Sequence, residues 1–254
     1  MIILEAGINH FGRTAEAKKL LNFFLNSNFN HLTFMIHTSK FYEDFKNKID
    51  FELKNEFYEK ALYLAHKKKK KIGVAVCDPV SFKKFSNIKF DFYKLLSISI
   101  NNKKLIKMLN EKRREVFISL GKGSDQKIKK CIDCFSSKKK LRLIYTSMSY
   151  NPADLNLQRI NELKKKFNLK VGYGHHYTNI KPLILSRVYN PSFCFLYIKK
   201  SPKNSKRIFP DHIHAFELDK LKKLREDLLE IDTIYQNKKT SFKIKINEIK
   251  KIKY

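Results

Sequence analysis

The 254-residue chain has no tryptophan and little glycine, with only 7 glycines, and it has no long apolar run. No apolar stretch approaches the roughly 18–20 residues that a membrane span needs, and no basic segment precedes an apolar one at the N-terminus. We therefore expect neither a membrane segment nor a signal peptide, and a cytoplasmic location. We find no internal repeat and no low-complexity linker.

Cysteine is also scarce. The four cysteines are Cys77, Cys131, Cys134 and Cys194. Cys131 and Cys134 form a C-x-x-C pair inside a predicted helix, but no second Cys or His pair lies near it, and a structural zinc site needs four ligands. We interpret these residues as thiols in a reducing compartment.

Acidic residues are few: 24 Asp and Glu stand against 54 Lys and Arg, which gives a formal net charge of +30. An excess of this size raises the question of nucleic-acid binding. The lysines, however, are spread over predicted helical faces and turns, and arginine, whose planar fork reads bases and phosphates, is rare. We expect weak, salt-sensitive contact with polyanions, and we do not expect nucleic-acid binding as the primary role.

Apolar residues make up 43% of the chain, and 21 phenylalanines supply much of the predicted core. Short apolar runs alternate with stretches of helical periodicity. The predicted strands cover residues 2–6, 31–36, 72–77, 92–97, 115–120, 141–147, 169–172 and 192–198. The predicted helices cover residues 14–25, 55–67, 81–85, 103–110, 125–135, 157–166, 181–188 and 218–229.

Eight such units predict an α/β protein, a closed (β/α)8 TIM barrel over residues 1–230. A doubly wound open sheet is the alternative, but it usually has fewer strands and a glycine-rich first turn, which is missing here. Residues 231–254 are rich in lysine and contain an alternating run at 242–246. We interpret this segment as a basic C-terminal tail with a possible edge strand.

Polar residues gather where the predicted strands end, which is where catalytic groups collect in parallel barrels. The first strand ends in Glu5-Ala6-Gly7-Ile8-Asn9-His10. Later segments are Lys94-Leu95-Leu96-Ser97, Ser119-Leu120-Gly121, Tyr145 to Pro152, Gly172-Tyr173-Gly174-His175-His176 and Pro210-Asp211-His212. In order and spacing, this set resembles the sialic acid synthase (N-acetylneuraminate synthase) family.

The resemblance covers roughly residues 1–230. It implies a (β/α)8 barrel followed by a small antifreeze-like domain. It also implies condensation of phosphoenolpyruvate with an acylated amino sugar, an N-acyl-mannosamine type, assisted by a divalent metal such as Mn²⁺ or Mg²⁺. Too little sequence follows residue 230 to form the antifreeze-like domain, so we expect it to be absent or supplied by another chain.

The resemblance also implies roles for individual residues. Glu5 falls on the carboxylate beside the sugar aldehyde and is the candidate catalytic residue. The candidate substrate-binding residues are Asn9, Tyr150 and Asp211 for the sugar and Lys94, Ser97 and Ser119 for phosphoenolpyruvate. His176 falls on the first metal histidine. Independently of the resemblance, a buried carboxylate at a strand end and an inward lysine are costly unless they meet a partner.

Several positions depart from the family pattern. Thr33 replaces a phosphate-binding lysine, Asp78 replaces a threonine, and Met148 replaces an asparagine. The second metal histidine is replaced by Lys199, whose charge would repel a metal ion. Lys199 could instead bind the phosphate, and His175, His212 or His10 could reach the barrel mouth in place of the lost ligand.

Two functions remain open at this stage. The first is a C–C bond-forming, phosphoenolpyruvate-dependent transferase of nonulosonic acid or surface-carbohydrate biosynthesis. The second is a catalytically degenerate sugar-binding barrel, or a helper paralogue of a complete synthase. The expected partners are the small-molecule substrates and either a second copy of the chain in a homodimer or a separate chain that supplies the missing domain.

Overall fold

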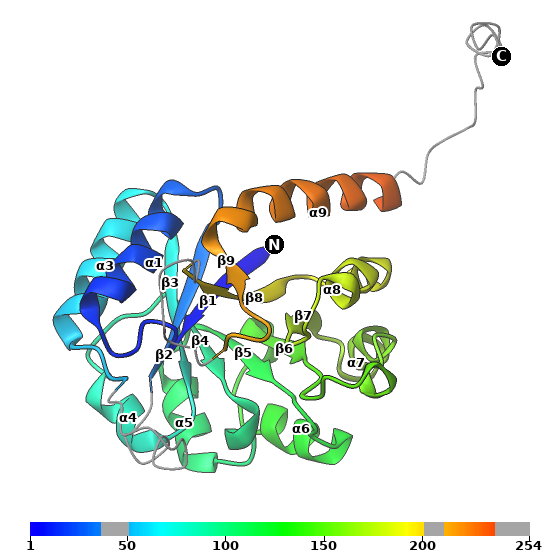
Figure 1. Cartoon of the computed structure of the whole chain (residues 1–254). Coiled ribbons are helices and arrows are strands. Elements are labelled where there is room, and N and C mark those ends of the chain that lie inside the picture. The colour runs from blue at the N-terminus through cyan, green and yellow to red at the C-terminus, as the bar shows by residue number, and fades with distance from the viewer. Residues whose placement is uncertain (37–50, 201–210, 237–254) are drawn as a thin grey trace, which may run out of the picture.

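A computed structural model describes residues 1–36, 51–200 and 211–236 of the chain. Eight parallel strands follow one another around a barrel, and β1 pairs with β8 to close it (Figure 1). The strands are β1 Ile2–Gly7, β2 His31–Ile36, β3 Lys71–Val76, β4 Phe92–Leu95, β5 Glu115–Ser119, β6 Leu141–Tyr145, β7 Lys170–His175 and β8 Cys194–Lys199. The predicted TIM barrel is therefore confirmed, and the open sheet is wrong. A short strand, β9 Phe216–Glu217, pairs with the end of β8.

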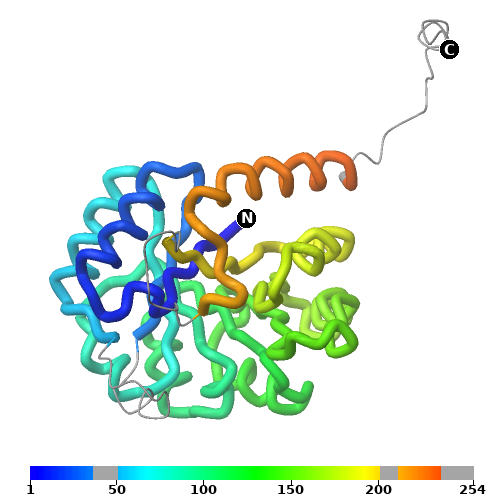
Figure 2. Tube along the Cα trace, viewed as in Figure 1, coloured from blue at the N-terminus to red at the C-terminus, as the bar shows by residue number. Residues whose placement is uncertain are grey.

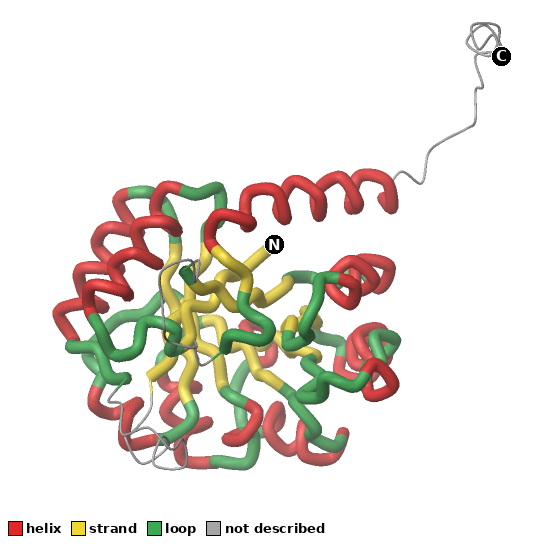
Figure 3. The backbone as a smooth tube through the Cα atoms, in the orientation of Figure 1, coloured by secondary structure: helices red, strands yellow, loops and turns green. Residues whose placement is uncertain are grey.

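Helices surround the barrel, as the ring around the strands in Figure 3 shows. They are α1 Thr14–Asn26, α3 Asn55–Lys67, α4 Pro79–Lys84, α5 Lys103–Glu111, α6 Asp125–Asp133, α7 Arg159–Phe167, α8 Lys181–Ser186 and α9 Leu221–Gln236. Their buried sides pack against the outward-facing strand residues to form the larger apolar core. This arrangement is what the helical periodicity of the sequence predicts.

The last helix, α9, continues through the expected domain boundary at residue 230 and ends at Gln236. In Figure 2, the orange segment that forms α9 runs close to the N-terminus. Arg187 ties this helix to the segment after α8, because its Nε donates to Asp232 Oδ1 at 2.6 Å. The predicted edge strand at 242–246 and the rest of the tail from 237 lie outside the described residues.

Phenylalanine rings fill the inside of the barrel. Phe117 lies at the centre of this packing, with edge-to-face contacts to Phe92, Phe193 and Phe195 at centroid distances of 5.5, 4.9 and 5.3 Å. Gly172 makes room for this packing, since a Cβ at that position would come within 2.2 Å of the Phe193 ring. These rings form a packed floor inside the barrel, and the carboxyl ends of the strands lie above it.

Strand alternation places polar side chains above this floor. Ile3, Phe92 and Phe117 are part of the inner apolar cluster, and Glu5, Lys94 and Ser119 come two residues later on the same strands. Residues two apart share one face of a strand. Glu5, Lys94 and Ser119 therefore point inward at the carboxyl end of the barrel.

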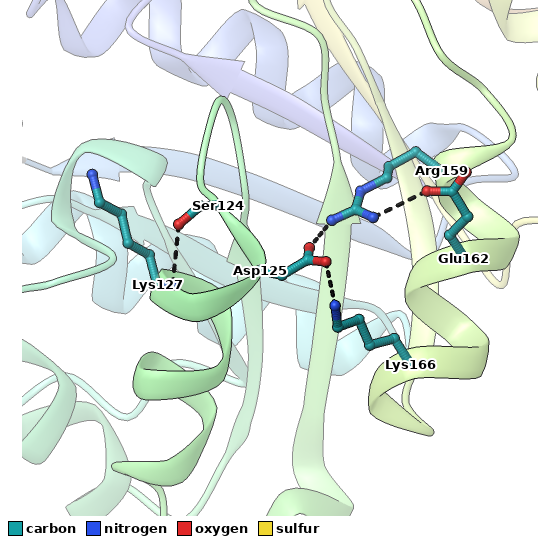
Figure 4. A network of polar contacts seen from close by, with 6 residues as sticks. All are labelled: Ser124, Asp125, Lys127, Arg159, Glu162 and Lys166. Atoms are coloured by element: carbon teal, nitrogen blue, oxygen red, sulfur yellow. Dashed lines mark hydrogen bonds and ion pairs between the residues drawn. The ribbon is translucent and has the colours of Figure 1, made fainter.

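Ion pairs on the outer ring join α6 to α7 (Figure 4). Asp125, in the first turn of α6, binds both Arg159 and Lys166 of α7, with a Lys166 Nζ–Asp125 Oδ2 distance of 2.5 Å. Arg159 also pairs with Glu162 at 3.0 Å. The side chain of Ser124 caps α6 by accepting from the Lys127 amide at 3.4 Å. These contacts orient neighbouring helices and lie outside the barrel.

Element ends differ from the predictions where polar residues continue a strand. The seventh strand is predicted to stop at Gly172, yet β7 continues to His175, which pairs with Leu196 of β8. Glycine and histidine resemble a turn in the sequence, but inter-strand pairing extends the strand through them. Conversely, β4 ends at Leu95, because Ser97–Ser99 form a turn of 3₁₀ helix.

Candidate active site

A buried ion pair lies just above the phenylalanine floor. Lys94 of β4 contacts Glu5 of β1 at 2.5 Å, with side-chain exposures of 3% and 2%. The Lys94 ammonium also lies 4.9 Å from the centre of the Phe195 ring and 5.6 Å from that of Tyr197. Burial raises the pKa of Glu5, and the nearby Lys94 opposes that rise. Two sequence-predicted site residues are thus brought together by strands that are not neighbours.

Asp211 approaches this pair from the loop after β8. A Cβ on Gly7 would lie 2.8 Å from both Asp211 Oδ2 and the Tyr197 ring, so only glycine allows this close approach. Gly7 also has a φ of +51°, which favours glycine. Burial and the negative charge of Glu5 raise the pKa of Asp211 to about 7, against the opposing effect of Lys94. Asp211 and Glu5 therefore share one electrostatic environment.

Two histidines and two tyrosines form the wall beside Asp211. The rings of His176 and His214 stack with a centroid distance of 4.5 Å and an interplanar angle of 16°. Tyr197 meets both rings edge-on, at 5.2 Å and 4.9 Å. The Tyr150 hydroxyl lies 3.3 Å from His214 Nδ1. Burial lowers the pKa of His214 to about 4 and that of His176 well below its usual value, so both rings are neutral at pH 7.

Among the described residues, three buried polar atoms in this region have no hydrogen-bond partner: Glu5 Oε2, Asp211 Oδ2 and His214 Nε2. His214 Nε2 lies 3.7 Å from Asp211 Oδ1, which is too far for a direct hydrogen bond. Unpaired buried polar atoms are costly unless something else satisfies them. Their clustering around the Glu5–Lys94 pair is the arrangement expected of a site for a ligand with several hydroxyl groups.

Asn9 holds the loop that carries Asp211. Its Nδ2 donates to the carbonyl of Ile198 at 2.9 Å, and its Oδ1 accepts from the Asp211 amide at 3.1 Å. Both of these contacts are made to backbone atoms. His10 is fully buried, and its Nδ1 accepts from the Gly12 amide at 3.1 Å. The structure therefore gives both residues a part in positioning the mouth.

The phosphate side of the predicted site is less charged. Ser119 is buried on the inward face of β5. Ser97 lies beside Gly121, where a Cβ would come within 2.9 Å of the serine hydroxyl. Thr33, at the position of the lost lysine, is buried and donates to the Leu4 carbonyl at 3.5 Å. Asp78 caps α4 by accepting from the Ser81 amide at 2.7 Å. Lys94, a predicted phosphoenolpyruvate-binding residue, is paired with Glu5.

The candidate replacements for the lost metal ligand lie in different places. Lys199 is buried and donates to the His212 carbonyl at 2.7 Å, so its ammonium anchors the loop before His214. The ring of His212 lies 3.1 Å from the same ammonium. His175 points away from the barrel interior and packs on Phe216 at 5.3 Å. None of these side chains lies beside His176 as a second ligand.

The residues present do not fit a divalent metal. An imidazole binds a metal in its ring plane at about 2.0–2.1 Å. The His176 and His214 planes are nearly parallel, and rings stacked in this way have no common point at that distance. Among the residues 1–36, 51–200 and 211–236, no group of three His, Cys, Asp or Glu side chains is arranged to hold a metal ion.

A family profile matches most of the chain. The NeuB family profile matches residues 17–240. The chain belongs to the NeuB family. The sialic acid synthase resemblance is thereby confirmed. Synthases of this family generally use a divalent metal, and this chain lacks a suitable ligand set in its described part.

Solved structures share the fold. An N-acetylneuraminic acid (sialic acid) synthetase from Leptospira borgpetersenii is 22% identical and matches with a TM-score of 0.84, over 98% of this chain and 89% of that one. A spore coat polysaccharide biosynthesis protein from Bacillus subtilis is 17% identical and matches with a TM-score of 0.78, over 92% and 68% of the two chains. At these identities the likeness concerns the barrel itself.

A curated relative is the pseudaminic acid synthase of Campylobacter jejuni, 28% identical over 88 residues. This match covers 33% of the present chain and 26% of the relative, so the chain spans about a quarter of the curated relative it matches. Within the described residues, no helix has both the length and the apolar character needed to cross a bilayer.

Sequence reasoning missed two members of the site. Tyr197 is not among the predicted site residues, although it follows the inward-facing Phe195 by two residues on β8. His214 carried no signal beyond its spacing of three residues from Asp211, and its stacking on His176 depends on the fold of two separate loops. Because alternate residues of a strand share one face, the inward position of Phe195 predicts that Tyr197 also faces inward.

Proposed function

We propose that this protein condenses phosphoenolpyruvate with an acylated amino sugar of the N-acyl-mannosamine type. The observation that carries the proposal is the cluster of unpaired buried atoms on Glu5, Asp211 and His214 around the Lys94 ammonium. Two acceptors and a ring nitrogen suit the hydroxyls and carbonyl of a sugar, and a buried cation suits an anionic co-substrate. Membership of the NeuB family supports this choice of reaction.

In the proposed reaction, C3 of phosphoenolpyruvate forms a C–C bond to the aldehyde carbon of the open-chain sugar. A water oxygen adds to C2, and the C2–O bond to phosphate breaks. Of the two water protons, one ends on the new hydroxyl and the other leaves with phosphate, so the product is a 2-keto acid. Glu5, beside the aldehyde, holds or moves the proton at its Oε2.

The other residues bind and orient the two substrates. Lys94, Ser97 and Ser119 hold phosphoenolpyruvate, while Tyr150 and Asp211 hold the sugar. The loop bonds of Asn9 fix Asp211 in place. Phosphoenolpyruvate is a cytoplasmic metabolite, so the proposal places the protein in the cytoplasm. The four free cysteines are compatible with that compartment.

The test is phosphate release from phosphoenolpyruvate in the presence of N-acetylmannosamine and related acyl sugars, with and without Mn²⁺. We expect release that depends on the sugar and falls at least about 100-fold in Glu5→Gln, because general acid–base groups typically contribute 10²–10⁴. Asp125→Asn, on the outer ring, is the matched acid-to-amide control and should retain full activity. Sugar-independent release, or equal rates in Glu5→Gln, would contradict the proposal.

A second candidate function is sugar binding without turnover. It is favoured by one observation: the lysine on the phosphate side is replaced by Thr33, which bonds to the barrel backbone. Calorimetry separates the two candidates. A protein that binds N-acetylmannosamine but releases no phosphate with any sugar would be a binding barrel or a helper of a complete synthase. Whether a second copy or another chain completes the mouth stays a prediction, which light scattering with the substrates present would test.

A further inference from the structure

The loop after β8 carries His214, whose imidazole could polarise the sugar carbonyl in place of a metal ion. His214 follows Asp211 by three residues, and its side chain is only 8% exposed. Its ring lies flat on His176 and edge-on to Tyr197. Lys199 fixes the loop two residues earlier, by donating to the His212 carbonyl at 2.7 Å. The ring is therefore held on three sides, and its orientation is set before any ligand binds.

A contact at the far side of the ring favours one tautomer of His214. The Tyr150 hydroxyl lies 3.3 Å from Nδ1. With the phenol as donor, Nδ1 accepts, and the neutral imidazole carries its proton on Nε2. That Nε2 is one of the buried atoms for which the described residues offer no hydrogen-bond partner, and it lies 3.7 Å from Asp211 Oδ1. The mouth thus holds one neutral donor and one carboxylate side by side.

We propose that the mouth binds its acyl sugar without a divalent metal. In this proposal His214 donates, through Nε2, a hydrogen bond to the aldehyde oxygen of the sugar. This inference rests on the proposed function. The stacking of His214 on His176 prevents the two rings from sharing a metal ion, as their near-parallel planes require. Lys199 stands at the sequence position of the second metal histidine in the family pattern, and its ammonium is bound to the His212 carbonyl. An oriented hydrogen-bond donor then stabilises the developing charge on the carbonyl oxygen.

The metal part of the inference is tested directly by electron paramagnetic resonance of Mn²⁺ mixed with the full chain. We expect the free Mn²⁺ signal to remain, and to be the same for wild type and His176→Ala. One Mn²⁺ bound per chain in the wild type, lost in His176→Ala, would overturn the inference. This readout needs no catalytic activity.

The His214 part is tested by calorimetric titration with N-acetylmannosamine. His214→Phe keeps a flat ring on His176 but removes the donor, and we expect its affinity to fall about tenfold or more. His214→Gln keeps an amide donor near the position of Nε2 and should recover part of the affinity. The control is His66→Phe, because His66 is an exposed histidine that pairs with Asp91 on the outer ring. Circular dichroism establishes that each variant is folded. Wild-type affinity in His214→Phe would overturn the assignment.

Phosphate release in EDTA separates this inference from the proposed function. Release that continues in EDTA and falls in His214→Phe supports both. Release that stops in EDTA and returns with Mn²⁺ supports the proposed function and overturns the metal-free site. If wild-type protein binds no N-acetylmannosamine and releases no phosphate, the proposed function fails, and the role given to His214 fails with it.

Discussion

Two of the ion-pair clusters in the described part of the chain have similar chemistry but differ in burial and in hydrogen bonding. At the barrel mouth, Glu5 and Lys94 are nearly inaccessible, and one oxygen of Glu5 has no partner. On the outer ring, both oxygens of Asp125 are used by Arg159 and Lys166, whose side chains are 26% and 53% exposed. The first cluster is buried and incompletely bonded, while the second is partly exposed and both oxygens of its carboxylate are bonded.

The difference shows which feature indicates a ligand site in a chain as basic as this one. Exposed pairs are screened by water and contribute little, so charge alone carries no functional information. A buried pair costs desolvation energy, and unpaired atoms beside it add to that cost. The Glu5–Lys94 pair at the mouth carries this desolvation cost, whereas the Asp125 cluster on the outer ring is partly exposed and has both carboxylate oxygens bonded. We infer that a bound ligand satisfies the unpaired atoms at the mouth.

The largest expected effect comes from breaking the buried pair. Lys94→Met leaves the Glu5 carboxylate without its counter-ion above the Phe195 ring, and we expect the free energy of unfolding to fall by about 3–5 kcal/mol. Urea denaturation measures this loss. The double variant Glu5→Gln/Lys94→Met removes both charges and should recover much of the stability. A double variant no more stable than Lys94→Met would show that the pair is not the cause.

A smaller effect is expected from the pH dependence of Asp211. Its folded-state pKa of about 7 lies above the ordinary value of 3.8, so the folded state holds the proton more tightly than the unfolded state. The stability that this group contributes is full below about pH 4 and is lost as the pH rises toward 7.

Urea midpoints at pH 5 and pH 8 provide the measurement for Asp211. We expect the decrease in stability between these values to be smaller in Asp211→Asn by at least about 1 kcal/mol, because one pKa unit corresponds to 1.36 kcal/mol. The exposed Asp154→Asn is the control and should keep the wild-type decrease. An Asp211→Asn variant with the wild-type pH dependence would mean that Asp211 is not buried in the manner described.

The smallest effect is expected on the outer ring. Asp125→Asn removes the charge that Arg159 and Lys166 share, and exposed pairs are worth about 0–1 kcal/mol. Its unfolding free energy should therefore change by no more than about 1 kcal/mol, and the change should shrink further in high salt. A loss as large as that of Lys94→Met would remove the distinction between the two clusters.

The fold could be predicted almost completely from the sequence. Each strand is a short apolar run and each helix has its own periodicity, so local patterns specify the eight repeated units. The errors are at element ends, where β7 continues through Gly174 to His175 because pairing with β8 holds it. Local sequence propensity does not predict such tertiary contacts. The last helix likewise extends beyond its predicted end at residue 229, to Gln236.

The candidate site could be predicted only in part. Glu5, Lys94 and Asp211 follow strand ends, so their gathering at one edge follows from the fold class. Their mutual contacts do not, because β1 and β4 are not neighbours and Asp211 arrives from a loop. Lys199 shows the same limit: a lost ligand was visible in the sequence, but its bond to the His212 carbonyl depends on loop geometry. The roles of all these residues remain predictions.

The most direct test of the account is a crystal structure of the protein with N-acetylmannosamine. The account predicts the sugar above the phenylalanine floor, with its polar atoms within hydrogen-bond distance of Glu5 Oε2, Asp211 Oδ2 and His214 Nε2. A sugar bound elsewhere, or a mouth in which ordered protein groups already satisfy those three atoms, would contradict it.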